Sequence, residues 1–271
     1  MHSFCTTILW GIGGYGLILM LVYLMQSHLL YFPTKEKIST PSHVGLAYEA
    51  VTLRTEDNLT LDSWFVPHSK PRGVVIFFHG NAGNMSHRLD TLTIFNQLGL
   101  STLIFDYRGY GASEGEISEK GSYKDARAAW NFLTEQRNIR PSKIIFIGRS
   151  LGGAVASQLA TVHTPKVLII ESSFTSVPKL AAAIYPFLPV RWLSRFQYDS
   201  ENNLKQLNCP ILVIHSPNDE IIPFEHGQRL HNTANQPKKF LVIRGGHNDG
   251  FITSGDAYRR GIDEFLNEFL K

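Results

Sequence analysis

The sequence predicts an α/β fold, in which a mostly parallel, eight-stranded sheet carries helices on both faces and follows one N-terminal transmembrane helix. Two observations support this prediction. No Asp, Glu, Lys or Arg occurs before Lys35, so the chain begins with an uncharged segment. From about residue 48 onward, short β-branched runs alternate with longer amphipathic stretches. This alternation is expected of strand–helix–strand units with right-handed crossovers.

The uncharged segment is predicted to contain a membrane anchor at residues 4–30. Within it, Ile8 to Met25 consists of fourteen apolar residues and four glycines, and about 20 helical residues cross the hydrocarbon core of a bilayer. The alternatives are a buried helix and a cleaved signal peptide, although no basic residue precedes the run and no A-x-A-like site follows it. Lys35 and Lys37 follow the span, which favours a single-pass protein whose larger part faces the cytoplasm.

Residues 31–47 are predicted to be a connector, because they contain Pro33 and Pro41 and show no helical period. Residues 48–271 form the predicted α/β domain. Its strands are predicted at Ala50–Arg54, Leu61–Val66, Val74–Phe78, Thr102–Asp106, Ile144–Ile147, Val167–Ile170, Ile211–His215 and Phe240–Ile243. Its helices are predicted at Ser86–Leu98, Tyr123–Gln136, Leu151–Thr161, Phe224–Thr233 and Asp256–Leu270. The first two strands form a hairpin, and the last six are apolar almost throughout, as expected for strands covered on both faces.

Charge and composition exclude several classes of protein. A formal net charge of +3 is too small for nucleic-acid binding, which needs a concentrated basic face. A hydrophobic content of 43% argues against a disordered chain. Cys5 lies in the apolar segment and Cys209 precedes a proline, so we expect neither a disulfide pair nor a metal site built on cysteine.

The loop after the predicted strand Ile144–Ile147 contains a candidate nucleophile. It reads Gly148-Arg149-Ser150-Leu151-Gly152-Gly153 and leads into an apolar helix. A Gly-x-Ser-x-Gly sequence between a strand and a helix exposes the serine hydroxyl on a strained turn, where a Cβ on either glycine would clash with the neighbouring strand and helix. Ser150 is therefore the predicted nucleophile, and the start of the helix favours a developing negative charge.

A second loop, His79-Gly80-Asn81-Ala82-Gly83-Asn84, follows the predicted strand Val74–Phe78. Acyl transfer needs backbone N–H donors aimed at the position where the carbonyl oxygen becomes negative. We assign one donor to Asn81, with Ala82 as the alternative, and the second to Leu151. A plain Asn–Gly turn is the competing interpretation of this loop. His79 is expected to be structural rather than a catalytic base.

Two further loops supply the partners that a serine nucleophile needs. Asp219 follows Ile211–His215, and His247 follows Phe240–Ile243. A hydroxyl requires a base such as imidazole, and the imidazole requires a carboxylate that fixes its tautomer. The order Ser150, Asp219, His247 along the chain is the one expected for α/β-hydrolases. Glu220 is the alternative to Asp219.

Two other features have open interpretations. Asp106 and Arg108 could line the site, but we expect an ion pair that stabilises their loop. The segment at about 175–209 is a short lid-like insertion, and its apolar part, residues 179–196, contains Pro186 and Pro189. This part is either a lid or acyl pocket above Ser150 or an ordinary helix that packs on the sheet.

Taken together, these motifs resemble the α/β-hydrolase superfamily, and within it a membrane-anchored subgroup similar to serine aminopeptidases, whose relatives include protein depalmitoylating thioesterases. The resemblance covers about Tyr48 to the C-terminus and is specific for the fold and the triad but not for the substrate. The matching residues are the two loops at 79–84 and 148–153, Asp106-Tyr107-Arg108-Gly109-Tyr110-Gly111, Ser113, Gly115, Glu171-Ser172-Ser173-Phe174, Asp219 and Gly246-His247.

The sequence thus predicts a membrane-anchored serine hydrolase that cleaves an ester, thioester or amide bond through an acyl-enzyme on Ser150, with His247 as the base and Asp219 orienting it. This chemistry requires no metal and no organic cofactor. The anchor and the apolar insertion favour an acyl-containing small molecule, a lipid or an acylated protein as the substrate. The alternative is a catalytically silent, membrane-bound scaffold or binding protein that retains the hydrolase fold.

Overall fold

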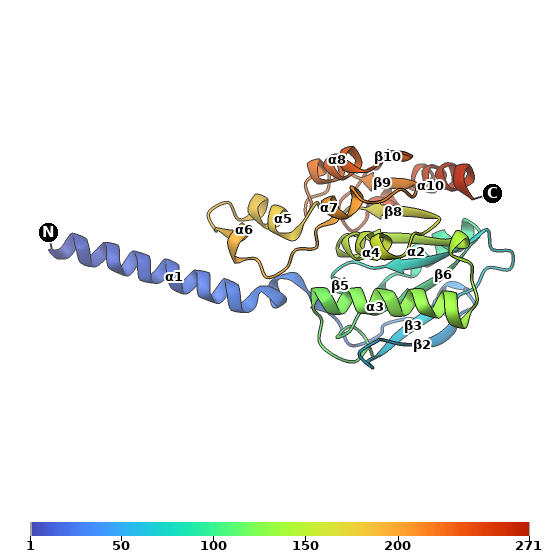
Figure 1. The fold of residues 1–271 in the computed structure, drawn as a ribbon, viewed down its shortest axis with the longest axis horizontal. Coiled ribbons are helices and arrows are strands. Elements are labelled where there is room, and N and C mark those ends of the chain that lie inside the picture. Colours follow the sequence, from blue (N-terminus) through green and yellow to red (C-terminus); the bar gives the residue numbers. More distant parts are fainter. Residues whose placement is uncertain (1, 271) are drawn as a thin grey trace.

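A computed structural model describes residues 2–270, and an eight-stranded sheet lies at its centre (Figure 1). The strand order is β10-β9-β8-β7-β4-β6-β3-β2. The β2–β3 and β3–β6 pairs are antiparallel, and the other five pairs are parallel. The strands are β2 (Glu49–Arg54), β3 (Thr60–Val66), β4 (Gly73–Phe78), β6 (Leu100–Phe105), β7 (Ile144–Arg149), β8 (Val167–Glu171), β9 (Ile211–His215) and β10 (Lys238–Val242). The predicted mostly parallel, eight-stranded sheet is confirmed.

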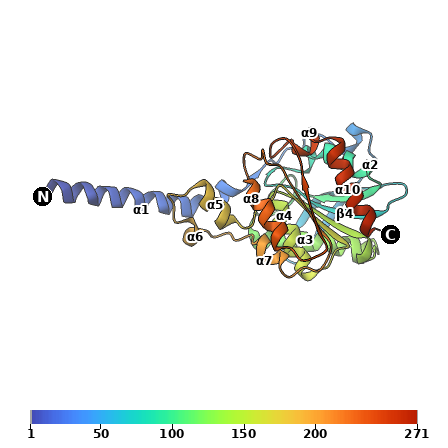
Figure 2. The same ribbon diagram turned by 90° about the horizontal axis from the view of Figure 1, so that it is seen from above.

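Helices cover both faces of the sheet, as predicted (Figure 2). One face carries α3 (Glu119–Asn131), α4 (Leu151–Val162), α7 (Ser200–Leu204) and α8 (Phe224–Thr233), and the other carries α2 (Leu89–Gln97), α9 (Gly250–Thr253) and α10 (Asp256–Phe269). Successive strand side chains point to opposite faces. Phe78 therefore packs in the core beneath α3 and α4, while its neighbour Phe77 packs in the core beneath α2 and α10.

The helix α1 (His2–Leu30) projects from the body as a single rod (Figure 1). By length and composition, Ile8–Leu30 could cross a membrane, and none of its most apolar window is buried in the protein. Large side chains such as Trp10 and Ile12 are exposed along it. The interpretation of this segment as a helix buried in the core is therefore wrong.

Residues 31–47, the predicted connector, run along the domain and take part in its packing. Tyr31 is buried in the core, and its hydroxyl lies 2.9 Å from that of Tyr198. The short strand β1 (Phe32–Pro33) pairs in parallel with β5 (Ala82–Gly83). The end of α1 is thereby joined to the loop that follows β4.

Two strand and helix predictions need correction. The edge strand β10 was expected to be covered on both faces, but its Lys239 and Val242 are exposed, because no strand lies beyond it and its cover is incomplete. Helix α3 begins at Glu119 rather than Tyr123, since Ser118 caps it by accepting the N–H of Gly121.

The apolar insertion forms two short helices, α5 (Val177–Ile184) and α6 (Val190–Leu193), beside α1 (Figures 1 and 2). At its base Val177 and Leu180 pack against the core, whereas Phe187 between the two helices and Trp192 on α6 are exposed. The expectation of an ordinary helix lying on the sheet is therefore wrong for this outer part.

Candidate active site

The turn between β7 and α4 holds Ser150 in a strained conformation. Its φ of 54° and ψ of −121° lie where L residues are rare, and such backbone strain costs about 1–3 kcal/mol and persists only when the surroundings enforce it. The last residue of β8 and the loop after it do so, because Ser150 N–H donates to Glu171 O at 2.9 Å and the Ser173 hydroxyl donates to Ser150 O at 2.7 Å.

Two glycines allow this turn to pack. A Cβ on Gly152 would collide with the carbonyl of Phe78 at the end of β4, and a Cβ on Gly148 would collide with the backbone of Gly152. The strand, turn and helix can therefore approach closely only with glycine at both positions. Close packing of the strand and the helix is also the reason why glycine was expected at both positions.

The His247 ring connects Ser150 to Asp219. Its Nε2 lies 3.1 Å from Ser150 Oγ, and its Nδ1 lies 2.8 Å from Asp219 Oδ2. All three side chains are largely buried. Since an ionised carboxylate can only accept, Nδ1 carries the proton and Nε2 is free to accept the proton of the hydroxyl. The structure thus brings His247 together with Ser150, 97 positions away along the chain, and with Asp219, 28 positions away.

The Asp219 carboxylate is held in its charged form. Burial raises its pKa, but hydrogen bonds from His215, His247 and the backbone of Ile222 outweigh burial and leave the pKa below its ordinary value. Oδ1 accepts the N–H groups of Ile221 and Ile222 at 3.0 and 2.7 Å. His215 Nε2 donates to Ile222 O at 2.9 Å and lies 3.4 Å from Oδ2.

Glu220, the alternative to Asp219, has a different contact. Its Oε2 accepts the backbone N–H of His247 at 2.9 Å. The Ser216 hydroxyl also donates to Gly245 O at 2.5 Å. Side chains of the loop after β9 are therefore hydrogen-bonded to the backbone of the loop after β10. Of the two neighbouring acids, only Asp219 contacts the imidazole.

The two expected oxyanion donors both have free N–H groups. Within residues 2–270, neither the N–H of Asn81 nor that of Leu151 donates to another group of the chain. The other polar groups of Asn81 are fixed: its side chain donates to Leu30 O at 2.7 Å, and its carbonyl accepts the N–H of Phe32 at 3.0 Å and the Tyr110 hydroxyl at 2.6 Å. The last residue of α1 thus positions the Asn81 loop.

His79 and Asp106 lie behind this loop. Both side chains are fully buried, with His79 Nε2 3.4 Å from Asp106 Oδ1. Among the described residues, the His79 side chain makes no hydrogen bond with Ser150. The expected ion pair between Asp106 and Arg108 is wrong. Arg108 instead binds Asp57 in the β2–β3 hairpin and Asp125 on α3.

A buried ionic cluster beneath Ser150 was missed by the sequence analysis. Arg149 donates to both carboxylate oxygens of Glu171, at 2.9 and 3.1 Å, and to Thr91. The Tyr258 hydroxyl donates to Glu171 at 2.7 Å. The available signal was a buried strand ending in Arg149 next to another ending in Glu171, since buried charges are normally paired.

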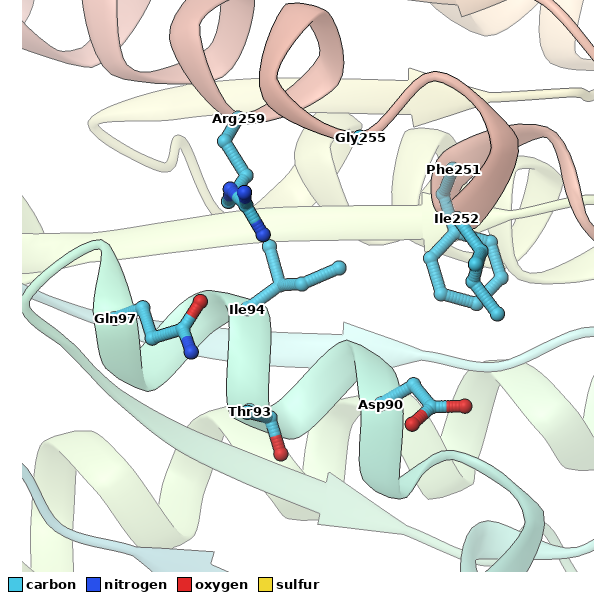
Figure 3. A pocket seen from close by; sticks show the side chains of 8 residues that line it. All are labelled: Asp90, Thr93, Ile94, Gln97, Phe251, Ile252, Gly255 and Arg259. Carbon is cyan, nitrogen blue, oxygen red and sulfur yellow. The ribbon is translucent and has the colours of Figure 1, made fainter.

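A hollow of about 260 Å³ lies on the α2–α10 face (Figure 3). Ile94 and Asp90 of α2 line one side, and Phe251 and Arg259 line the other. None of the residues around Ser150 lines it. The centroid of the Phe251 ring also lies 3.9 Å from Arg149 Cζ. The hollow is therefore next to the buried Arg149 cluster and not next to the Ser150 hydroxyl.

No group of three or more His, Cys, Asp or Glu side chains that could hold a metal ion occurs in the part of the chain that the structure describes. Cys209 is buried and unpaired, and burial raises the pKa of its thiol to about 11.

Comparison with known proteins gives consistent matches. The family model described as serine aminopeptidase, S33 matches residues 69–199. This span includes the loops at 79–84 and 148–153 and ends before Asp219. The Arabidopsis thaliana alpha/beta hydrolase domain-containing protein WAV2 is 31% identical over 99% of this chain and 96% of its own length.

Two fungal relatives also match most of the chain. Protein bem46 of Schizosaccharomyces pombe is 34% identical over 91% of this chain and 87% of its own. An uncharacterized membrane protein of Saccharomyces cerevisiae is 33% identical over 91% of this chain and 90% of its own. Among solved structures, the Pyrococcus furiosus esterase Pf2001 aligns with a TM-score of 0.76 and 20% identity over 89% of this chain and 99% of that one. At this identity the likeness shows the fold alone.

Proposed function

Because this chain belongs to the α/β-hydrolase family, we propose that it is a membrane-anchored serine hydrolase. It cleaves an ester, thioester or amide bond by way of an acyl-enzyme on Ser150. The observation that carries this proposal is the hydrogen-bonded series from Ser150 through His247 to Asp219. A hydrolase acting through a serine requires this arrangement, and a scaffold does not.

In the proposed reaction, Ser150 Oγ attacks the carbonyl carbon while His247 Nε2 takes up the hydroxyl proton. Asp219 holds Nδ1–H and stabilises the imidazolium that forms. The N–H groups of Asn81 and Leu151 stabilise the oxyanion, and one such donor contributes about 100- to 1000-fold in rate. His247 then protonates the leaving alcohol, thiol or amine. Water attacks the acyl-serine with the same imidazole as base, which releases the acid and restores the hydroxyl.

The proposed anchor is α1, from Ile8 to Leu30. Its exposed apolar side chains and the description of the yeast relative as a membrane protein support this role. Lys35 and Lys37 after the span favour a cytoplasmic active site. Since Leu30 binds the Asn81 loop, the reaction would take place close to the membrane surface, which favours a lipid, an acylated protein or another acyl-containing substrate.

A fluorophosphonate probe, which phosphonylates activated serine hydroxyls with loss of fluoride, tests the mechanism. We expect the full chain in detergent to be labelled, Ser150→Ala to lose the label, and Ser172→Ala, the neighbouring serine of the β8 loop, to keep it. A panel of p-nitrophenyl esters of increasing chain length then gives the acyl preference. Labelling of Ser150→Ala at the wild-type rate would refute the nucleophile, and the absence of both labelling and turnover in the wild type would favour the scaffold.

A further inference from the structure

The helical hairpin at residues 177–194, which comprises α5 and α6 and which we call the cap, is attached to α1. The Tyr15 hydroxyl donates to Phe187 O at 2.9 Å, and the Gln26 side-chain amide donates to Leu193 O at 2.8 Å. Gln26 in turn accepts the N–H of Arg195 at 2.8 Å. Both views of the fold show α5 and α6 alongside α1 (Figures 1 and 2).

From these contacts we infer that the cap is a second membrane-inserted element, which lies in the phospholipid bilayer beside α1. This inference rests on the proposed membrane anchoring of α1 but not on the proposed chemistry of Ser150. It assigns the bilayer as the partner of an apolar surface that otherwise has none.

The depth of the contacts supports the inference. Gln26 is the first polar residue after the apolar run of α1 and lies near the end of the proposed span Ile8–Leu30, so it is close to the membrane surface. Tyr15 lies eleven residues farther along the helix, which is about 16 Å at 1.5 Å per residue. The hydrocarbon core is about 30 Å thick. If α1 spans the bilayer, the end of the cap that contacts Tyr15 is therefore among the acyl chains.

The side chains of the cap suit that environment. No charged residue occurs from Leu180 to Val190, whereas Lys179 and Arg191 lie at the two ends of this stretch. Phe187 is 69% exposed and Trp192 is 92% exposed. In water these large apolar side chains would be exposed to solvent, but in a bilayer lipid would cover them. Lys179 and Arg191 would lie at the headgroup level, and Trp192, next to Arg191, would lie against the adjoining ends of the acyl chains.

The backbone of the cap is also suited to lipid, in which unpaired N–H and C=O groups are costly. Between residues 185 and 194, six of the eight backbone N–H groups donate within the cap, and Pro186 and Pro189 have none. Two carbonyls at irregular positions, those of Phe187 and Leu193, accept hydrogen bonds from α1 side chains. Irregular backbone at membrane depth is tolerated when the protein satisfies it in this way.

The four tryptophans of the chain allow a direct test. Trp64 and Trp130 are buried, whereas Trp10 on α1 and Trp192 on the cap are exposed. The full chain is reconstituted into phosphatidylcholine–phosphatidylglycerol vesicles with and without brominated acyl chains, which quench tryptophan on contact. Trp10→Phe then reports Trp192, Trp192→Phe reports Trp10, and the double variant gives the background of the two buried indoles.

We expect the brominated lipid to quench the fluorescence of both single variants well beyond the loss seen in the double variant. Quenching of Trp10 without quenching of Trp192 would overturn the inference and leave the anchor intact; a cap covered by a protein or by a second copy of the chain would give this result. Absence of quenching from both residues would overturn the anchor and the cap together. Fluorophosphonate labelling of each variant serves as an independent check of folding and of the proposed chemistry.

Discussion

At the scale of single residues, the proposed hydrolysis depends on the different roles of two neighbouring acids, Asp219 and Glu220. Asp219 contacts His247 Nδ1, and Glu220 contacts only the backbone N–H of His247. Charge on Asp219 is therefore needed to hold the imidazole tautomer and to stabilise the imidazolium, whereas Glu220 needs only an acceptor oxygen.

We therefore predict that Asp219→Asn lowers kcat on a p-nitrophenyl ester by about 10⁴-fold, the loss expected when the carboxylate of a serine triad becomes an amide. Glu220→Gln is the matched control, and it should retain most of the wild-type kcat because its amide oxygen still accepts the N–H of His247. Initial rates of the two variants give the comparison. An equal loss in both would assign the orienting role to the loop as a whole rather than to Asp219.

The pH dependence of this defect follows from the lowered pKa of Asp219. A carboxyl group whose pKa is lower in the folded chain contributes stability that is present above its unfolded pKa of about 3.9 and is lost as the pH falls through the folded pKa. Asp219 is thus ionised at any pH above about 5, and the ratio of wild-type to Asp219→Asn rates should show no carboxyl titration above that pH.

The residues of this site differed in how far sequence could predict them. Ser150 and Asp219 follow buried strands and His247 follows the edge strand β10. Loops after parallel strands meet at one edge of the sheet, so their convergence could be anticipated. Arg108 could not be paired correctly, since its partners Asp57 and Asp125 are distant in sequence and only the tertiary fold selects them.

At the scale of elements, six strands of the main sheet were predictable because each contains a run of apolar residues, and β2 and β3 were predictable as a hairpin. The pair β1–β5 was not, since two residues in each strand carry no periodic pattern. The position of the cap also depends on hydrogen bonds between segments about 170 residues apart, which no local pattern encodes.

The β1–β5 pair makes the proposed oxyanion loop depend on the chain before it. A fragment of residues 26–271 retains Leu30 and Phe32, which hold Asn81, whereas a fragment of residues 35–271 lacks both. We predict that the shorter fragment hydrolyses p-nitrophenyl acetate about 10- to 100-fold more slowly, through a misplaced donor. Fluorophosphonate labelling rates provide a second measurement.

Thermal melting of the two fragments serves as the control, because the shorter one also loses the buried Tyr31. Rates are therefore compared well below both melting temperatures. Equal rates there would show that residues 26–34 do not position the Asn81 loop.

At the scale of the whole molecule, the reactive edge of the sheet and the proposed anchor lie at the same end. The Asn81 loop follows β4 and contacts the last residue of α1, and Ser150 follows β7, which is parallel to β4. The carboxyl ends of parallel strands lie at one edge of a sheet. Ser150 is consequently near the loop that the end of α1 contacts, since a Cβ on Gly80 would lie 3.5 Å from Ser150 Cβ. Figure 1 shows α1 leaving the body from this end of the domain.

This arrangement predicts a preference for substrate that is held in the same membrane. With the full chain in vesicles, a long-chain p-nitrophenyl ester dissolved in the bilayer should be cleaved about 100-fold faster than by the fragment 26–271 in solution, because anchoring raises the effective concentration of enzyme and ester. On water-soluble p-nitrophenyl acetate the two proteins should be equally fast, since α1 contributes no reacting group. If the soluble fragment matched the anchored chain on the embedded ester, the active site would not face the bilayer, even with the Ser150 chemistry intact.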